Sequence, residues 1–128
     1  MAAEKYDADW VVKVDDDVYL SVERLLLAMK QWDRMEAGYV GCLKNGAVWT
    51  EPGTRWYEPQ HLLLGSNYYL HSYGSIYALR GRAVEDVIVR NLDNLRLLAN
   101  EDTMVGLWML AHGVKLFEDM RLCSPTCT

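Results

Sequence analysis

Residues 9–17 of the chain read DWVVKVDDD, a short apolar run that leads directly into three consecutive carboxylates. A β-branched apolar run of this length predicts a buried strand, which should end where Asp15 begins the acidic triplet. Because alternate side chains of an extended chain share a face, Asp15 and Asp17 should point one way and Asp16 the other. Two carboxylates on one face repel each other unless a cation or hydrogen-bond donors lie between them.

The acidic triplet is therefore a candidate metal site. Hard oxygen ligands suit magnesium or manganese, particularly when substrate phosphates complete the coordination shell. Ligands of open α/β sheets bind beyond the carboxyl ends of the strands, and Asp15–Asp17 follow a strand in this way. The alternative interpretation is a solvated acidic turn, and the buried strand that precedes the triplet favours the metal.

Strands and helices alternate along the rest of the chain. Apolar residues at helical spacing, with Ser21 as the N-cap, predict a helix that ends near Gly38. Residues 45–65 are rich in Gly, Pro, Trp and Tyr and form a long loop, a feature that is usually functional in compact domains. This alternation indicates an α/β fold with a mixed, mostly parallel sheet flanked by helices. We expect further helices over 82–91 and 101–112, and further strands over 39–43, 73–79 and 114–117.

The composition excludes several classes of protein. The chain has 128 residues, 51% of them apolar, which is enough for the core of one domain and argues against intrinsic disorder. The formal net charge is −5 and Lys and Arg form no basic run, so we expect no nucleic-acid partner. No uninterrupted apolar stretch is longer than that of residues 25–29, which is far below the roughly 18 residues that a membrane-spanning helix needs.

The three cysteines are Cys42, Cys123 and Cys127. From burial tendency alone, we expect Cys42 to be a buried free thiol. Cys123 and Cys127 should be either paired with each other or free thiols without a functional role. The Cys-x-x-x-Cys spacing has no second pair and no nearby His, so it is a weak zinc signal. In a luminal protein, a disulfide between Cys123 and Cys127, or one of longer range, is the alternative.

A second acidic pair, Glu101 and Asp102, opens the last predicted helix, whose apolar side carries Val105 and Trp108. Carboxylates in a first helical turn are favoured by the helix dipole and by the free backbone N–H groups, which is a purely structural explanation. The functional alternative is a general base. Such a base needs a pKa that is raised by burial or by neighbouring acids.

The long loop and the strand after it carry a group of aromatic residues. Their rings can stack on the apolar faces of sugars, or they can simply pack the loop onto the sheet. Within the group, His71 is more easily a structural histidine than a metal ligand, because nothing in the sequence identifies its partner. The group consists of Trp56, Tyr57, Tyr68, Tyr69, His71 and Tyr73, with Glu58 and Pro59 beside them.

Five motifs follow one another in the order of a known family. They are KVDDDVY at 13–19, YVGC at 39–42, WYEP at 56–59, YLHSYGSIYA at 69–78 and NEDTMVG at 100–106. In this order they resemble the inverting β-1,3-galactosyltransferase (hexosyltransferase) family, most closely its plant and green-algal branch. The resemblance runs from Trp10 to Cys127 and implies a GT-A type fold. It also implies a UDP-sugar donor, a manganese or magnesium ion, a glycan or glycoprotein acceptor, and a place on the luminal side of the Golgi membrane.

The resemblance also implies roles for individual residues. Asp17 matches the position of direct metal contact, Asp15 a metal, donor or second-shell contact, and Asp102 the catalytic base. A single inverting displacement forms no covalent sugar–enzyme intermediate, so no nucleophilic Ser or Cys is expected. The residues expected to bind the donor or the acceptor are Asp16, Trp56, Tyr57, Glu58, His71, Gly74 and Glu101.

By the same resemblance, residues 1–128 form the C-terminal part of a catalytic domain. The nucleotide-binding half and the membrane anchor are expected upstream of this part. Two other functions are compatible with the residues: a non-catalytic remnant of a glycosyltransferase, and a metal-dependent phosphohydrolase that uses the same acids. The sequence contains no Gly-rich phosphate cradle that would favour the phosphohydrolase.

Overall fold

A computed structural model describes residues 8–123 of the chain, and its centre is a four-stranded sheet in the order β1-β3-β2-β4. The strands are β1 (Trp10–Val14), β2 (Tyr39–Lys44), β3 (His71–Arg80) and β4 (Leu116–Glu118). β3 pairs antiparallel with β1 and with β2, and only the β2–β4 pair is parallel. The expected α/β class is confirmed, and so is the mixed sheet.

The expectation of a mostly parallel sheet is wrong, because two of the three strand pairs are antiparallel. β1 and β2 do run in the same direction, as a connection through a helix predicts, but β3 lies between them. β3 returns from the end of β2 as the second strand of a wide hairpin, in which Lys44 pairs with His71. The long loop of residues 45–70 closes this hairpin and so reverses the direction of the chain.

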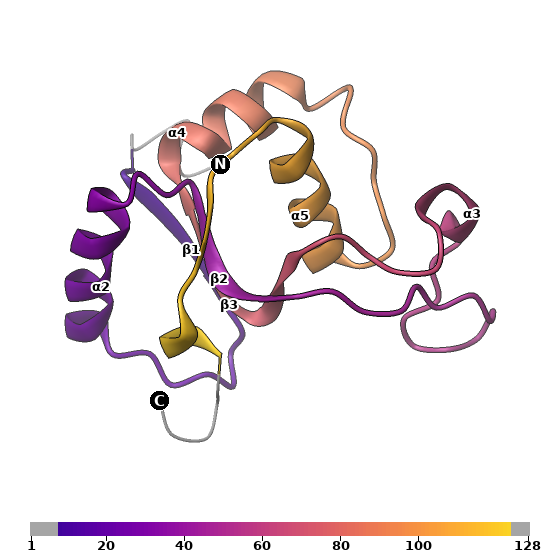
Figure 1. The fold of residues 1–128 in the computed structure, drawn as a ribbon, viewed down its shortest axis with the longest axis horizontal. Helices are drawn as coiled ribbons and strands as arrows, with labels where there is room; N and C mark the ends of the chain where they lie inside the picture. The colour runs from indigo at the N-terminus through magenta and orange to yellow at the C-terminus, as the bar shows by residue number, and fades with distance from the viewer. Residues whose placement is uncertain (1–7, 124–128) are drawn as a thin grey trace.

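Helices cover both faces of the sheet (Figure 1), with α2 (Val22–Arg34) on one side and α5 (Glu101–Ala111) on the other. Ser21 accepts a hydrogen bond from the backbone of Arg24 and caps α2 as expected, but the helix ends four residues before Gly38. Gly113 follows α5 with a φ of +67°, the left-handed conformation that favours glycine after a helix. No helix of the described residues is long and apolar enough to cross a membrane.

The helix expected over 82–91 is present as a continuous helical segment whose hydrogen-bond pattern changes along its length. It begins as α4 (Gly81–Ala83), continues as a π-helical turn, η1 (Val84–Ile88), and ends as a 3-10 turn, η2 (Val89–Asn91). Two short helices complete the fold. They are α3 (His61–Leu64), inside the long loop, and η3 (Met120–Leu122), after β4.

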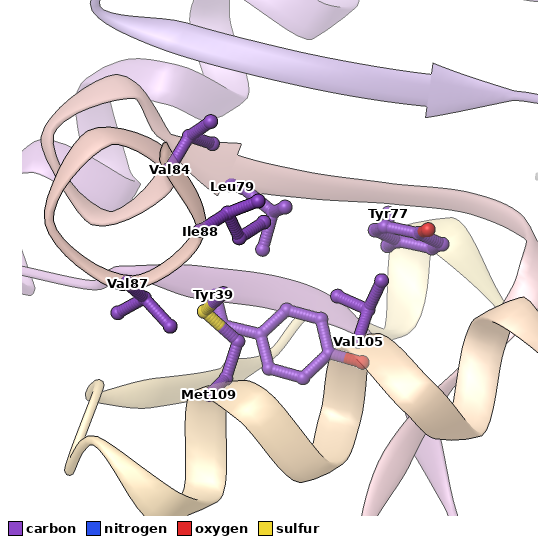
Figure 2. Close-up of a cluster of buried hydrophobic side chains, with 8 residues drawn as sticks. All are labelled: Tyr39, Tyr77, Leu79, Val84, Val87, Ile88, Val105 and Met109. Carbon is purple, nitrogen blue, oxygen red and sulfur yellow. The ribbon is translucent and has the colours of Figure 1, made fainter. Parts of the chain in front are cut away.

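The sheet separates two hydrophobic cores. Because side chains alternate across a strand, neighbouring residues such as Tyr39 and Val40 enter different cores. Figure 2 shows the first core, in which Tyr39 of β2 faces Met109 and Val105 of α5. Trp108 is only partly buried at the margin of this core, so Met109, with no exposed surface, is the central residue of α5.

The second core lies between the sheet and α2, and its largest residue is Trp32, which has no exposed surface. The indole Nε1 of Trp32 donates a hydrogen bond to Oδ2 of Asp119 at 2.8 Å. Arg121 donates two further hydrogen bonds to the same carboxylate through its guanidinium group. Asp119 is only 4% exposed, so this network satisfies a charged group that would otherwise be costly to bury.

Asp119 makes the stability of the fold depend on pH in the acid range. Burial alone would raise the pKa of Asp119, but the hydrogen bonds from Arg121 and Trp32 outweigh burial and hold it below its usual value. The network therefore stabilises the fold fully above the unfolded-state pKa of about 3.9, and this stabilisation is lost as the pH falls through the lower folded-state pKa. Urea unfolding of the full-length protein between pH 2 and pH 5 should show this loss, and Asp119→Asn should remove most of it. The exposed Asp93→Asn is the matched control, and an Asp119→Asn variant with the parental pH dependence would contradict the assignment.

Cys42 is not a free thiol. It forms a disulfide with Cys123, with the two Cα atoms 4.7 Å apart, and the bond joins residues separated by 81 positions. The preferred expectation for Cys42 and Cys123 is therefore wrong, and the long-range alternative holds. Cys127 lies outside the described residues. The disulfide fastens the segment after β4 to β2, and this same segment carries Asp119 and Arg121.

Candidate active site

Residues from three elements meet at the carboxyl end of β1. The backbone N–H of Asp15 donates to the carbonyl of Ser75 at 2.9 Å, which extends the pairing with β3 beyond the last residue of β1. The ammonium group of Lys13 donates to Oδ1 of Asp15 at 2.6 Å and to the carbonyl oxygen of Gly74. Lys13 thus joins the first acid of the triplet to the middle of β3.

Asp102, in the first turn of α5, lies directly against Gly74. A Cβ atom added at Gly74 would lie 2.2 Å from Oδ2 of Asp102 and 2.7 Å from its Cγ. Only a residue without a side chain leaves room for the carboxylate in this position. The structure therefore brings together two of the residues that the sequence analysis selected from different motifs.

The surroundings of Asp102 favour its protonated form more than water does. Burial raises the pKa of Asp102, the positive charge of Lys13 opposes this effect, and the negative charges of Glu101 and Asp15 add to it. The net result is a pKa above the ordinary value for an aspartate. A half-buried carboxylate of this kind binds a proton more readily than an exposed one, which is the property required of a general base.

Lys13 is the residue of this site that the sequence analysis did not select. Burial alone would lower the pKa of Lys13, but the hydrogen bond to Asp15 and the negative charges of Asp102 and Glu101 raise it, so the lysine stays charged. A signal was available, because Lys13 and Asp15 are two residues apart on one strand and therefore share a face. This spacing alone could have identified Lys13 as a partner for Asp15.

Glu101 and His71 surround this group without joining it directly. Glu101 is exposed, and its Oε1 accepts a hydrogen bond of 3.2 Å from the hydroxyl of Tyr77. His71 is 3% exposed, its Nδ1 lies 2.9 Å from the carbonyl of Tyr69, and its Cβ packs against Gly106 of α5. Burial lowers the pKa of His71, and the contact with Tyr69 opposes this effect only in part. His71 thus holds β3 against α5.

Asp16 and Asp17 are exposed, and neither side chain makes a hydrogen bond within residues 8–123. The same residues contain no group of three His, Cys, Asp or Glu side chains that could enclose a metal ion. An enclosed site is not required for magnesium or manganese, which are commonly held by one or two carboxylates together with substrate phosphates and water. The donor chemistry of Asp15 and Asp17 therefore fits a metal that is shared with a phosphorylated substrate.

The WYEP motif lies elsewhere, on the long loop. Trp56 is 45% exposed and packs edge-to-face on Trp49, with the ring centroids 5.1 Å apart. Tyr57 is half-buried near His61, whereas Glu58 is completely buried. Among the described residues, no hydrogen bond or ring contact joins Trp56 or Tyr57 to the carboxylates around Lys13. Trp56 and Tyr57 are therefore not bonded to the carboxylate cluster, which consists of Asp15, Glu101 and Asp102 around Lys13 and Gly74.

Comparison with known proteins matches residues 1–120 to the family model described as Galactosyltransferase. The chain is 42% identical over 123 residues to Probable beta-1,3-galactosyltransferase 13 of Arabidopsis thaliana, and this match covers 96% of the chain and 36% of that protein. Probable beta-1,3-galactosyltransferase 12 of the same plant is 39% identical over 127 residues, which are 99% of the chain and 34% of that protein. Hydroxyproline O-galactosyltransferase HPGT3 is 34% identical over 124 residues, or 95% of the chain and 36% of that protein.

The chain thus spans about a third of the length of these relatives, which are matched over 36%, 34% and 36% of their sequences. The family model, in contrast, matches nearly the whole chain and all five of the motifs quoted above. The expected resemblance is confirmed, and the chain belongs to the galactosyltransferase family.

Proposed function

We propose that the protein carrying this chain is a metal-dependent inverting hexosyltransferase. It moves a hexose, in the first instance galactose, from a UDP-sugar to a hydroxyl group of a glycan or glycoprotein and forms a β-1,3 linkage. The family membership supports the transfer of a hexose. The observation that carries the mechanism is the half-buried Asp102 carboxylate beside Gly74, with a pKa raised by burial.

In the proposed reaction, Asp102 accepts the proton of the acceptor hydroxyl as that oxygen attacks the anomeric carbon. The new carbon–oxygen bond forms as the bond to the UDP oxygen breaks, and the electron pair leaves with UDP. Because one displacement occurs at the anomeric carbon, its configuration inverts. Lys13 keeps Asp15 beside Gly74 during this step. A positioned general base such as Asp102 contributes a rate acceleration of about 10²–10⁴-fold.

Asp15 and Asp17 would hold the divalent cation, with Asp17 in direct contact and Asp15 bonded to Lys13. When bound, manganese or magnesium neutralises the negative charge of the departing diphosphate. The exposed residues Asp16 and Trp56 and the half-buried Tyr57 are proposed to contact the donor or the acceptor, Trp56 by stacking on the apolar face of a sugar. Glu101 and Gly74 complete the proposed binding surface, and buried His71 would contribute to it by holding β3 against α5.

A GT-A type fold and a location on the luminal side of the Golgi membrane belong to the same proposal. The Cys42–Cys123 disulfide supports the location, because disulfides persist in oxidising compartments and are rare in the cytosol. The mixed sheet with helices on both faces supports the fold type.

The test is an assay of UDP release from UDP-galactose and manganese by the full-length protein, with and without a galactose-terminated acceptor. If the protein is a hexosyltransferase, the rates of UDP release and of product formation should both rise with the concentration of the acceptor. Absence of turnover with every UDP-hexose would favour the non-catalytic remnant. Release of phosphate from simple esters without a UDP-sugar would favour the phosphohydrolase.

The acidic triplet should bind manganese weakly when no nucleotide is present, because few protein ligands are available and substrate phosphates complete the shell. We expect a titration calorimetry signal with a modest affinity, which Asp17→Ala should reduce by at least about ten-fold, or about 1.4 kcal/mol. Asp93→Ala, which removes an exposed acid on a turn outside the triplet, is the control. If Asp17→Ala binds manganese as well as the parent protein does, the metal assignment is wrong.

A further inference from the structure

Glu58 is a buried carboxyl group that the proposed reaction does not use. Its side chain has no exposed surface, and in the described part of the chain it forms no ion pair. Instead, its two oxygens accept hydrogen bonds from two backbone N–H groups, Oε2 from Gln60 and Oε1 from Ala99, both at 2.8 Å. Glu58 therefore joins the long loop to a segment that lies 41 residues further along the chain.

Gln60 adds two more bonds between the same segments. Its amide Nε2 donates to the carbonyl of Leu97 at 2.5 Å, and its Oε1 accepts from the guanidinium group of Arg96 at 2.6 Å. We call this set of bonds, from Glu58 and Gln60 to residues 96–99, the loop clasp. On its other side the segment is held by α5, because Nε1 of Trp108 donates to the carbonyl of Arg96 at 2.8 Å.

The segment that the loop clasp holds leads directly into the start of α5, which carries Asp102 of the carboxylate cluster. Residues 95–98 belong to no helix or strand, so side chains rather than a ladder of backbone bonds determine their position. Asn100 occupies the N-cap position of α5, but its side chain makes no capping hydrogen bond. The first turn of α5, which carries Asp102, therefore begins without a cap of its own, only two residues after Ala99.

We propose that Glu58 and Gln60 are positioning residues for Asp102, which hold the start of α5 so that its carboxylate lies against Gly74. This inference rests on the proposed role of Asp102 as the base. It also assigns a function to Glu58 other than contact with a substrate, because both of its oxygens are already bonded to the backbone. Contact with the donor or the acceptor was the role that the family resemblance implied for Glu58.

The test compares Glu58→Gln with the parent in the full-length protein. A glutamine has one acceptor oxygen instead of two, so its amide nitrogen must face a backbone N–H and one bond of the clasp is lost. We expect kcat to fall about 10- to 100-fold, since a misplacement of about 1 Å far from the chemistry can cost about 10² in rate. The affinity for the UDP-sugar should not change. Glu51→Gln, the same change at an exposed position of the loop, should leave kcat unchanged.

The double variant Glu58→Gln/Asp102→Asn separates positioning from general destabilisation. If Glu58 acts through Asp102, the double variant turns over as fast as Asp102→Asn alone, because coupled residues are not additive. If the two losses multiply, Glu58 acts on something other than Asp102 and the proposal is overturned. Should Glu58→Gln fail to fold, Gln60→Ala gives the same comparison, since its partly exposed side chain leaves no buried group unpaired.

Hydrogen exchange of the peptide containing residues 95–99 provides a readout that does not depend on activity. Glu58→Gln should speed exchange at Ala99, whereas Glu51→Gln should not. Faster exchange with parental kcat would show a clasp without a positioning role and overturn the proposal. Near-parental turnover of Asp102→Asn would instead disprove the base and with it the positioning role, even though exchange at Ala99 still responds to Glu58→Gln.

Discussion

Asp102→Asn should lower turnover of the full-length protein by about 10²–10⁴-fold, the usual contribution of a positioned acid–base group. The substitution keeps the size of the side chain and its place against Gly74 but removes the proton acceptor. The affinity for the UDP-sugar should change little, because the proposed partner of Asp102 is the acceptor hydroxyl. Steady-state kinetics with a fixed acceptor and a separate measurement of donor binding check both expectations.

Glu101→Gln is the matched control for this prediction. Glu101 is the next residue on α5, is exposed, and accepts one hydrogen bond from Tyr77, which a glutamine can also accept. Its loss of turnover should be much smaller than that of Asp102→Asn. Near-parental turnover of Asp102→Asn together with inactivity of Glu101→Gln would reverse the assignment. Loss of UDP-sugar binding in Asp102→Asn would move Asp102 to the donor site.

The raised pKa of Asp102 adds a consequence for the pH profile. Asp102 acts as a base only when deprotonated, so turnover falls as the pH drops through its pKa. Because burial raises this pKa, the fall should begin at a higher pH than for an ordinary aspartate. The acid limb of kcat/KM should therefore be absent from the residual activity of Asp102→Asn.

Trp32→Ala should lower the free energy of unfolding by about 3–5 kcal/mol, the usual cost of removing a buried tryptophan side chain. Trp32 has no exposed surface, fills the core between α2 and the sheet, and packs edge-on against Trp10. The substitution leaves a cavity and also removes the Trp32 hydrogen bond to buried Asp119. Urea or thermal unfolding of the full-length protein measures the loss.

Trp108→Ala makes the same chemical change at a partly buried site. Its indole also donates one hydrogen bond, to the carbonyl of Arg96, but water can reach the site and partly replace the lost contacts. The loss of unfolding free energy should therefore be clearly smaller than for Trp32→Ala. Equal losses in the two variants would contradict the difference in burial on which the prediction depends. Trp32→Phe should recover most of the packing but not the bond to Asp119.

Features that depend on near neighbours were predicted well. The apolar run of residues 10–14 does form a strand that ends at the acids, and Ser21 does cap the helix that follows. The helix that begins at Glu101 and the glycine that follows it are also where the pattern predicts them. Side-chain alternation and helical spacing are set within a few residues, so the amino-acid order alone carries them. The five motifs are also read directly from the amino-acid order, and the family that they indicated is confirmed.

The rest was decided by contacts between distant residues. The sequence does not show that β3 inserts between β1 and β2, because strand pairing depends on which edges meet after the long loop closes. Nor does it show that Cys42 meets Cys123, or that Glu58 is buried and accepts a hydrogen bond from the backbone of Ala99. Burial tendency treats each residue separately, whereas these outcomes require a partner that lies tens of residues away.

The candidate site combines both kinds of information. Its residue types were determined by the sequence: acids after a strand, a glycine in β3, and an acid at the start of a helix. Only the tertiary structure decided that Asp102 lies against Gly74 and that Lys13 links Gly74 to Asp15. It also decided that Trp56 and Tyr57 of the loop make no hydrogen bond to these carboxylates within the described residues. The physical reason is that the raised pKa and the close packing at Gly74 arise from burial and charge contributed by three separate elements, which only the folded chain brings together.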